Sequence, residues 1–103
     1  MRRAAHIDLN QPAIVAALLA AHCSVQSLAA VGCGVPDLLV WSPYTRELHL
    51  LEVKNPERLR GNDPIAQSQR QFMKAWKGPV SIVETVSEAL AVVGYDGVPW
   101  VDE

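Results

Sequence analysis

Apolar residues recur with helical spacing in the first part of the chain, just after Pro12. Asn10 precedes this segment and is a good N-cap residue, and proline is favoured in the first turn of a helix. The apolar stripe consists of Ile14, Val15, Leu18 and Leu19. This pattern predicts a helix over residues 11–22.

Three segments that follow have patterns typical of β-strands. Residues 24–28 alternate between polar and apolar positions and end before a glycine-rich stretch. Residues 35–41 and 48–53 are nearly all apolar, and the polar segment between them contains Pro43. We therefore expect a short strand followed by a β-hairpin.

Helical spacing returns after a polar loop at residues 55–63. The start of a second helix is marked by Asn62, Asp63 and Pro64. One face of this helix, which we expect to be buried, carries Ile65, Gln69, Phe72 and Trp76. We expect the helix to end at Gly78 and Pro79, because both residues disfavour helical continuation.

The remaining elements complete an α/β chain. Residues 80–84 are predicted to form a strand, and Ser87 is expected to cap a last helix that runs to about Val93 and stops at Gly94. The predicted order is α-β-β-β-α-β-α. The chain has 103 residues, of which half are hydrophobic. We therefore expect a single domain over residues 1–103, with a core at about 8–94 and an irregular acidic tail at 95–103.

Targeting signals and cysteines bear on the cellular location. No apolar run approaches the roughly 20 residues of a membrane span, and the first residues lack the apolar stretch of a signal peptide. We expect no membrane partner and a location in the cytoplasm of a bacterial cell or a phage-infected host. The only two cysteines, Cys23 and Cys33, are then expected to be reduced, partly buried thiols. The three histidines show no zinc-ligand spacing relative to them.

The net charge of -2 conceals an uneven distribution. Residues 46–77 carry seven basic and four acidic residues, whereas residues 78–103 carry five acidic residues and no basic one. A basic cluster of this kind is often only a solvated surface. It becomes informative about phosphate binding if a reactive site lies beside it.

Two carboxylates and a lysine lie in the predicted hairpin. Folding it symmetrically about Tyr44 and Thr45 places Asp37 opposite Glu52, with Cβ atoms about 5 Å apart on one face of the sheet. Lys54 follows two residues after Glu52 and shares that face. Two carboxylates at this distance repel unless a cation neutralises them, and their oxygens are the hard ligands that Mg²⁺ or Mn²⁺ prefers. A hairpin loop one residue longer or shorter would turn Asp37 to the opposite face.

The residues alone leave two interpretations open. A Glu-x-Lys pair on a strand is common and usually reflects a solvated or salt-bridged face. By contrast, a Pro-Asp pair that enters an apolar strand and faces a second acidic residue destabilises a sheet, and is not expected there unless it has a function. Together, Asp37, Glu52 and Lys54 support the catalytic and the structural interpretations equally.

These residues resemble a known motif. Pro36-Asp37, followed on the next strand by Glu52-Val53-Lys54, is similar to the PD-(D/E)XK motif of a large nuclease superfamily, whose core is a mixed central sheet flanked by helices. More narrowly, the chain resembles small, stand-alone VRR-NUC proteins of phages and bacteria, which are related to Holliday-junction resolvases. The similarity covers roughly residues 2–94 and includes RRAAHIDLNQPAIVAAL, SVQSLAAVGCGVPDLLV, LHLLEVKNP and SQRQFMKAWKGPVSIV.

The resemblance assigns roles to the motif residues. It implies that Asp37, Glu52 and the backbone carbonyl of Val53 bind Mg²⁺ or Mn²⁺. Lys54 would orient or activate the attacking water and stabilise charge on the phosphate. Gln69 matches a glutamine of the family on the second helix, and it is also open to a purely structural interpretation as a core glutamine bonded to backbone.

Other positions have less defined roles. Many superfamily members carry an acidic residue on the first helix, which helps to hold a second metal. This chain has Gln11 there, whose neutral amide is a weak ligand, so one firmly held metal is the safer expectation. Asp8 lies nearby, before the helix, as a further possible contributor. Candidates for phosphate contacts are Arg58, Arg60, Arg70 and Lys74, while Lys77 is more typical of a solvated surface. Trp41 and Trp100 are suited to stacking on bases or to packing at a subunit interface.

The leading hypothesis is a metal-dependent nuclease that hydrolyses DNA phosphodiester bonds. We expect a structure-selective endonuclease acting on branched or duplex DNA, and a homodimer, because related stand-alone proteins act as dimers and a small chain gains core by dimerisation. The alternative is a catalytically weak or inactive nucleic-acid-binding protein that keeps the fold. A purely structural or partner-binding protein has only the acidic tail as support.

Overall fold

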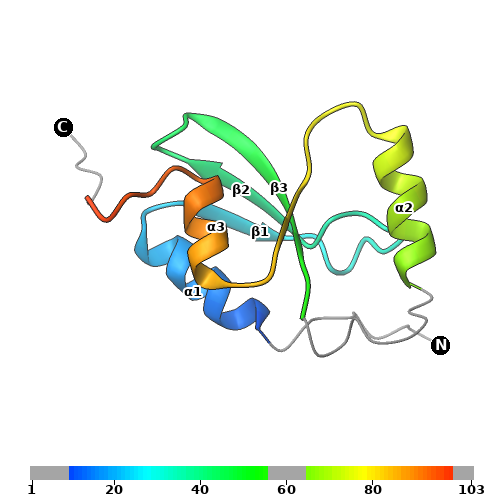
Figure 1. Cartoon of the computed structure of the whole chain (residues 1–103), viewed down its shortest axis with the longest axis horizontal. Helices are drawn as coiled ribbons and strands as arrows, with labels where there is room; N and C mark the ends of the chain where they lie inside the picture. Colours follow the sequence, from blue (N-terminus) through cyan, green and yellow to red (C-terminus); the bar gives the residue numbers. More distant parts are fainter. Residues whose placement is uncertain (1–9, 56–64, 99–103) are drawn as a thin grey trace.

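The computed structural model describes residues 10–55 and 65–98 and places helices on a mixed β-sheet (Figure 1). The order along the chain is the predicted one. The elements are α1 (Gln11–Ala20), β1 (Ser24–Ser27), β2 (Leu38–Ser42), β3 (Glu47–Val53), α2 (Ile65–Ala75), β4 (Ser81–Val83) and α3 (Val86–Val92). The α/β class and the PD-(D/E)XK-like core are therefore confirmed.

The four strands lie in the order β1-β2-β3-β4. The first three are antiparallel, whereas β4 runs parallel to β3. Helices α1 and α3 lie together on one face of the sheet, and α2 stands apart from them (Figure 1). No helix in the described part of the chain is long and apolar enough to cross a membrane.

The hydrophobic core lies between the sheet and the pair α1 and α3. Alternate residues of each strand point into it, because side chains of a strand alternate between the two faces of the sheet. Its buried members include Ile14, Leu18, Leu38, Val40, Leu51, Val53, Val83, Ala89 and Val93. The residues between these on β3, including Glu52, therefore belong to the opposite face.

The hairpin turn between β2 and β3 is tied to the ends of both packing helices. Buried Ser42 donates a hydrogen bond from its Oγ to the carbonyl of Val93, at 2.5 Å. The hydroxyl of Tyr44 donates to the carbonyl of Ala21, at 2.7 Å. A Cβ built on Gly94 would lie 3.1 Å from the Cγ2 of Thr45, so the backbone after α3 also lies close to the turn.

Some predicted boundaries and caps are wrong. β2 begins at Leu38 rather than at residue 35, because Pro36 has no N–H to give to a neighbouring strand. The cap of α3 is Thr85, not Ser87: its Oγ1 accepts from the Glu88 N–H, and the Glu88 carboxylate accepts from the Thr85 N–H. This is a capping box, whose Thr-x-x-Glu spacing was present in the sequence.

Two predictions of burial are also wrong. Cys33 is exposed, whereas Cys23 is buried, and both thiols are free. The face of α2 that we expected to be buried is only partly covered, with Phe72 half-buried and Trp76 46% exposed. Neither α1 nor α3 reaches this face, since both lie on the other side of the molecule (Figure 1). The predicted start of α2 at residues 62–64 and the tail from residue 99 lie outside the described residues.

Candidate active site

The register of the hairpin brings Asp37 and Glu52 together. Leu38 pairs with Leu51, and Leu39 pairs with Leu50, as the symmetrical fold about the turn predicted. One further step along the two strands sets Asp37, which directly precedes β2, opposite Glu52. Asp37 is held there by the backbone of β3, because its Oδ2 accepts a hydrogen bond from the Val53 N–H at 2.7 Å.

Glu52 is a buried carboxylic acid, with 4% of its surface exposed. Its burial, and then the negative charge of Asp37, raise its pKa to about 7, while nearby Lys54 acts in the opposite direction. The pair therefore binds a proton more tightly than two separate carboxylates would. A divalent cation could take the place of that proton and neutralise both groups.

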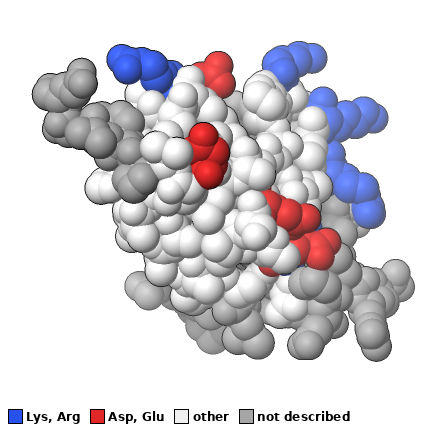
Figure 2. Space-filling model, turned by 60° about the vertical axis from the view of Figure 1, so that its left-hand side comes forward, with Lys and Arg blue, Asp and Glu red and all other residues white. Residues whose placement is uncertain are grey.

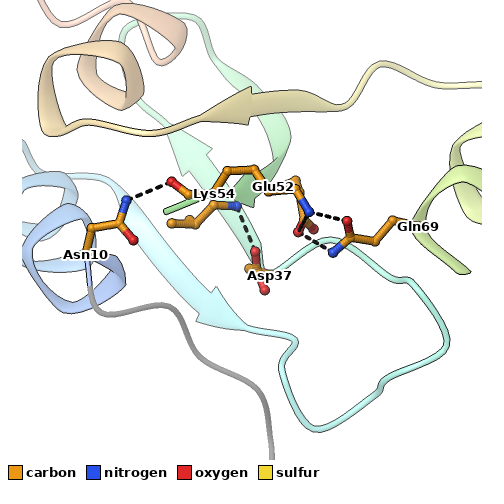
Figure 3. A network of polar contacts seen from close by, with 6 residues as sticks. Asn10, Asp37, Glu52, Lys54 and Gln69 are labelled. Atoms are coloured by element: carbon orange, nitrogen blue, oxygen red, sulfur yellow. Dashed lines mark hydrogen bonds and ion pairs between the residues drawn. The ribbon is translucent and has the colours of Figure 1, made fainter. Parts of the chain in front are cut away.

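Lys54 and Gln69 complete a ring of polar contacts around Glu52 (Figure 3). The Lys54 ammonium lies 3.4 Å from Glu52 Oε2 and donates a hydrogen bond to Gln69 Oε1. The Gln69 amide donates in turn to Glu52 Oε2, at 2.6 Å. These bonds of Gln69 run to side chains of the motif rather than to backbone groups, which favours the interpretation of Gln69 as a member of the site.

Helix α2 carries Gln69 and reaches the site through a close backbone contact with Gly34. A Cβ built on Gly34 would lie 2.1 Å from the carbonyl oxygen of Ser68, the residue before Gln69. Gly34 also has a φ of +77°, in the left-handed region that glycine tolerates best. Only glycine therefore allows α2 to approach the segment that leads into Asp37.

The start of α1 contributes two amides, one of which sequence reasoning assigned differently. Gln11 is buried, with 4% of its surface exposed, and its Oε1 has no hydrogen-bond partner. Asn10 was expected to cap α1, but its side chain makes no capping bond. Its Nδ2 donates instead to the carbonyls of Lys54, at 3.0 Å, and Glu84, at 2.7 Å (Figure 3).

The oxygen donors of the site fit a hard divalent cation. Two carboxylates, those of Asp37 and Glu52, lie beside each other at the end of β3, next to the backbone of Val53. Within residues 10–55 and 65–98 no group of three or more His, Cys, Asp or Glu side chains gathers in a way that could hold a metal. A cation here would thus depend on two carboxylates together with backbone oxygen, which is a donor set suited to Mg²⁺ or Mn²⁺.

The predicted phosphate contacts are placed only in part. Arg70 and Lys74, one turn apart on α2, are both exposed, as is Lys77. Figure 2 shows a row of basic side chains along one edge of the molecule. Arg58 and Arg60 fall outside the described residues, and so do Asp8 and Trp100.

Comparison with known proteins decides the family. Residues 6–86 match the model of the VRR-NUC domain. The chain belongs to the VRR-NUC family. Searches of curated proteins and of solved structures found no match. The VRR-NUC match spans all the motif residues, from Gln11 on α1 to Gln69 on α2, and it identifies the chain as a nuclease domain.

Proposed function

We propose that this VRR-NUC chain is an Mg²⁺- or Mn²⁺-dependent deoxyribonuclease that hydrolyses phosphodiester bonds, acting as a structure-selective endonuclease on branched or duplex DNA. The observation that carries the proposal is the convergence of Asp37, Glu52, Lys54 and Gln69 at the end of β3. Three of these side chains are linked by direct polar contacts, and the fourth, Asp37, is bonded to the backbone between Glu52 and Lys54.

The metal would be held by the carboxylates of Asp37 and Glu52 and by the backbone carbonyl of Val53. When bound, it would supply a hydroxide nucleophile near neutral pH and neutralise charge on the phosphate. Glu52 must lose its proton to act as a ligand, and its pKa of about 7 puts that step near physiological pH. Gln11 would be an accessory residue, and its neutral amide argues for one firmly held ion.

Lys54 would act on the reacting phosphate through its positive charge. Its ammonium can stabilise negative charge that builds up on the phosphate oxygens, and it can orient the attacking water. Gln69 fixes the direction of this ammonium, because one end of its amide accepts from Lys54 and the other end donates to Glu52. Arg70, directly after Gln69, and Lys74, about one turn further along α2, would bind neighbouring phosphates without reading the base sequence.

A cleavage panel tests this proposal. The full chain is incubated with single-stranded, duplex, flap and four-way-junction DNA in Mg²⁺, Mn²⁺ or chelator, beside the variants Lys54→Ala and Lys77→Ala. We expect metal-dependent cutting of branched or duplex DNA that Lys54→Ala abolishes and Lys77→Ala, an exposed lysine of the same molecule, retains. Equal cutting by wild type and Lys54→Ala would place the chemistry elsewhere.

The panel also distinguishes the alternative of an inactive binding protein. Calorimetric titration of Mn²⁺ into the wild type should show binding that Glu52→Gln removes. A wild type that binds DNA but neither binds Mn²⁺ nor cuts any substrate would support a nucleic-acid-binding protein that has kept the nuclease fold.

We also propose that the chain forms a homodimer. The face of the sheet opposite the core exposes large apolar side chains at its end away from Glu52: Trp41 (41%) and Leu48 (62%), which are paired across β2 and β3. A second copy would cover them and so extend a small core. Sedimentation velocity of Leu48→Ser should then show a shift toward monomer that Val98→Ser, an equally exposed residue elsewhere, does not. A monomeric wild type at micromolar concentration would refute the dimer.

A further inference from the structure

Asn10 lies at the start of α1 but acts on the end of β3. Its side-chain nitrogen donates one hydrogen bond to the carbonyl of Lys54 and a second to the carbonyl of Glu84, which follows β4. The two acceptors are 44 and 74 residues away in sequence. In Figure 3 Asn10 approaches Lys54 from the side opposite to Gln69.

The carbonyl of Lys54 needs this donor because the sheet does not supply one. In the parallel pair of β3 and β4, the Lys54 N–H donates to the carbonyl of Val83. Continuing that ladder would give the Lys54 carbonyl the N–H of Thr85. Thr85, however, donates its N–H to the Glu88 carboxylate in the capping box of α3. The Thr85 N–H is therefore used by the capping box of α3, and the Asn10 side chain donates to the Lys54 carbonyl in its place.

Because its side chain bonds to Lys54 and Glu84, Asn10 does not cap α1. Asparagine is among the best N-cap residues, but only when its backbone is extended, so that its side chain can turn to the N–H groups of the first turn. Here its backbone is helical, with φ -83° and ψ -10°, and the side chain makes no capping bond. A helix start without its cap is unfavourable, which indicates that the bonds to Lys54 and Glu84 are what this residue contributes.

We infer that Asn10 is a positioning residue for Lys54. It fixes the backbone of Lys54 on the carbonyl side, as β4 fixes it on the N–H side, and so sets where the lysine side chain begins. Gln69 then fixes where the side chain ends. The inference rests on the proposed nuclease function, because it assigns Lys54 the role of the group that acts on the phosphate.

The orientation of the Asn10 amide supports this assignment. Its Nδ2 faces two carbonyl oxygens, so the reversed amide would set its oxygen against both of them. Its Oδ1 is buried and has no hydrogen-bond partner. The donors of Asn10, and not its acceptor, therefore account for its placement, and an isosteric residue that cannot donate should lose the function.

The test compares Asn10→Asp with the wild type in the full chain. Aspartate has nearly the same shape and lacks both donors, and its negative charge would lie beside the positive end of α1, so folding should survive. Gln26→Glu is the matched control, since it makes the same amide-to-acid change on an exposed strand residue. Asn10→Ser is a second variant, which is smaller and uncharged and also lacks the amide.

Two measurements are made. The first is hydrogen exchange of backbone amides, followed by NMR without metal, which reports on the Lys54 N–H that bonds to β4. In Asn10→Asp we expect the Lys54 amide to exchange faster and the Leu51 amide, in the middle of β3, to exchange at an unchanged rate. Steady-state cleavage should show kcat reduced about 10- to 100-fold with KM within about twofold, because a displacement of about 1 Å at a reacting group has an effect of this size. Gln26→Glu should change neither.

Each outcome decides the inference. A folded Asn10→Asp with unchanged Lys54 exchange overturns it, and so does faster exchange with an unchanged kcat. Loss of folding in both Asn10 variants also overturns it, because Asn10 would then be a determinant of the fold. A wild type that cuts no DNA refutes the proposed function instead, and the exchange measurement still shows whether Asn10 holds Lys54.

Discussion

Replacing Glu52 by glutamine should make the metal-free protein more stable near pH 8. Glu52→Gln keeps the size of the side chain and removes its charge. In the folded protein the ionised carboxylate is disfavoured by burial and by the charge of Asp37, which together raise its pKa to about 7 from an ordinary value of 4.5. If neutralising Glu52 stabilises the protein, a bound cation that neutralises the same carboxylate should also stabilise it.

The pKa of Glu52 gives both the size and the sign of the effect. Below pH 4.5 the carboxyl is protonated in the folded and unfolded states, and folding carries no penalty from it. As the pH rises from 4.5 through 7, the unfolded state ionises first and the folded state loses stability. Above pH 7 the full penalty is present, about 3 kcal/mol, because each pKa unit corresponds to about 1.4 kcal/mol.

Urea unfolding in the presence of a chelator measures this difference. We expect Glu52→Gln to exceed the wild type by up to about 3 kcal/mol in free energy of unfolding at pH 8, and by less than about 1 kcal/mol at pH 5. Glu47→Gln is the matched control, as an exposed glutamate of the same strand, and should change stability by less than about 0.5 kcal/mol. Titrating groups that do not interact with Glu52 are common to wild type and variant, so they cancel in the difference.

A variant that is no more stable than the wild type at pH 8 would refute this reasoning. So would a gain that is the same at pH 5 as at pH 8, because the effect would then come from packing rather than from charge. Saturating Mn²⁺ should remove the gain by stabilising the wild type alone.

Further predictions concern the metal and the placement of α2. Mn²⁺ affinity measured by calorimetry should rise between pH 6 and pH 7.5, since Glu52 must lose its proton; a flat profile would contradict its role as a ligand. Gly34→Ala should reduce cleavage at least about tenfold by displacing α2, at a cost of about 1–2 kcal/mol in unfolding free energy. Gly32→Ala, with similar φ and open space around it, should retain activity, and equal losses in both would contradict the contact with α2. Gln69→Leu should lower kcat about 10- to 100-fold, and Gln71→Leu on the same helix should not; full activity of Gln69→Leu would exclude Gln69 from orienting Lys54.

The sequence was sufficient to predict the hairpin and the residues that face each other in it. Side chains of a strand alternate with a period of two, and a turn centred at Tyr44 and Thr45 leaves one symmetrical pairing. That pairing placed Asp37 opposite Glu52, and the observed register agrees. The order of the helices and strands was equally accessible, because each element has its own pattern of apolar residues.

The contacts that were not predicted depend on groups far apart in the sequence. Asn10 looked like a cap since its acceptors, the carbonyls of Lys54 and Glu84, belong to other elements. The exposure of Trp76 could not be inferred from a stripe on one helix, because a stripe does not say what covers it. Thr85 is a different case: its capping box was readable, and Ser87 was chosen although it lacks a glutamate three residues later.

The anchoring of the hairpin turn restricts where the chain can change in length. The turn lies five residue pairs from Asp37 and is bonded through Ser42 and Tyr44 to the ends of α3 and α1. One inserted residue would have to reverse the faces of a strand or break these anchors, and either change would separate the two carboxylates. Insertions and deletions among related chains should therefore be rare between β2 and β3 and more frequent at the exposed residues 76–79, before β4. An alignment of relatives tests this directly, and turns of varied length between β2 and β3 would contradict it.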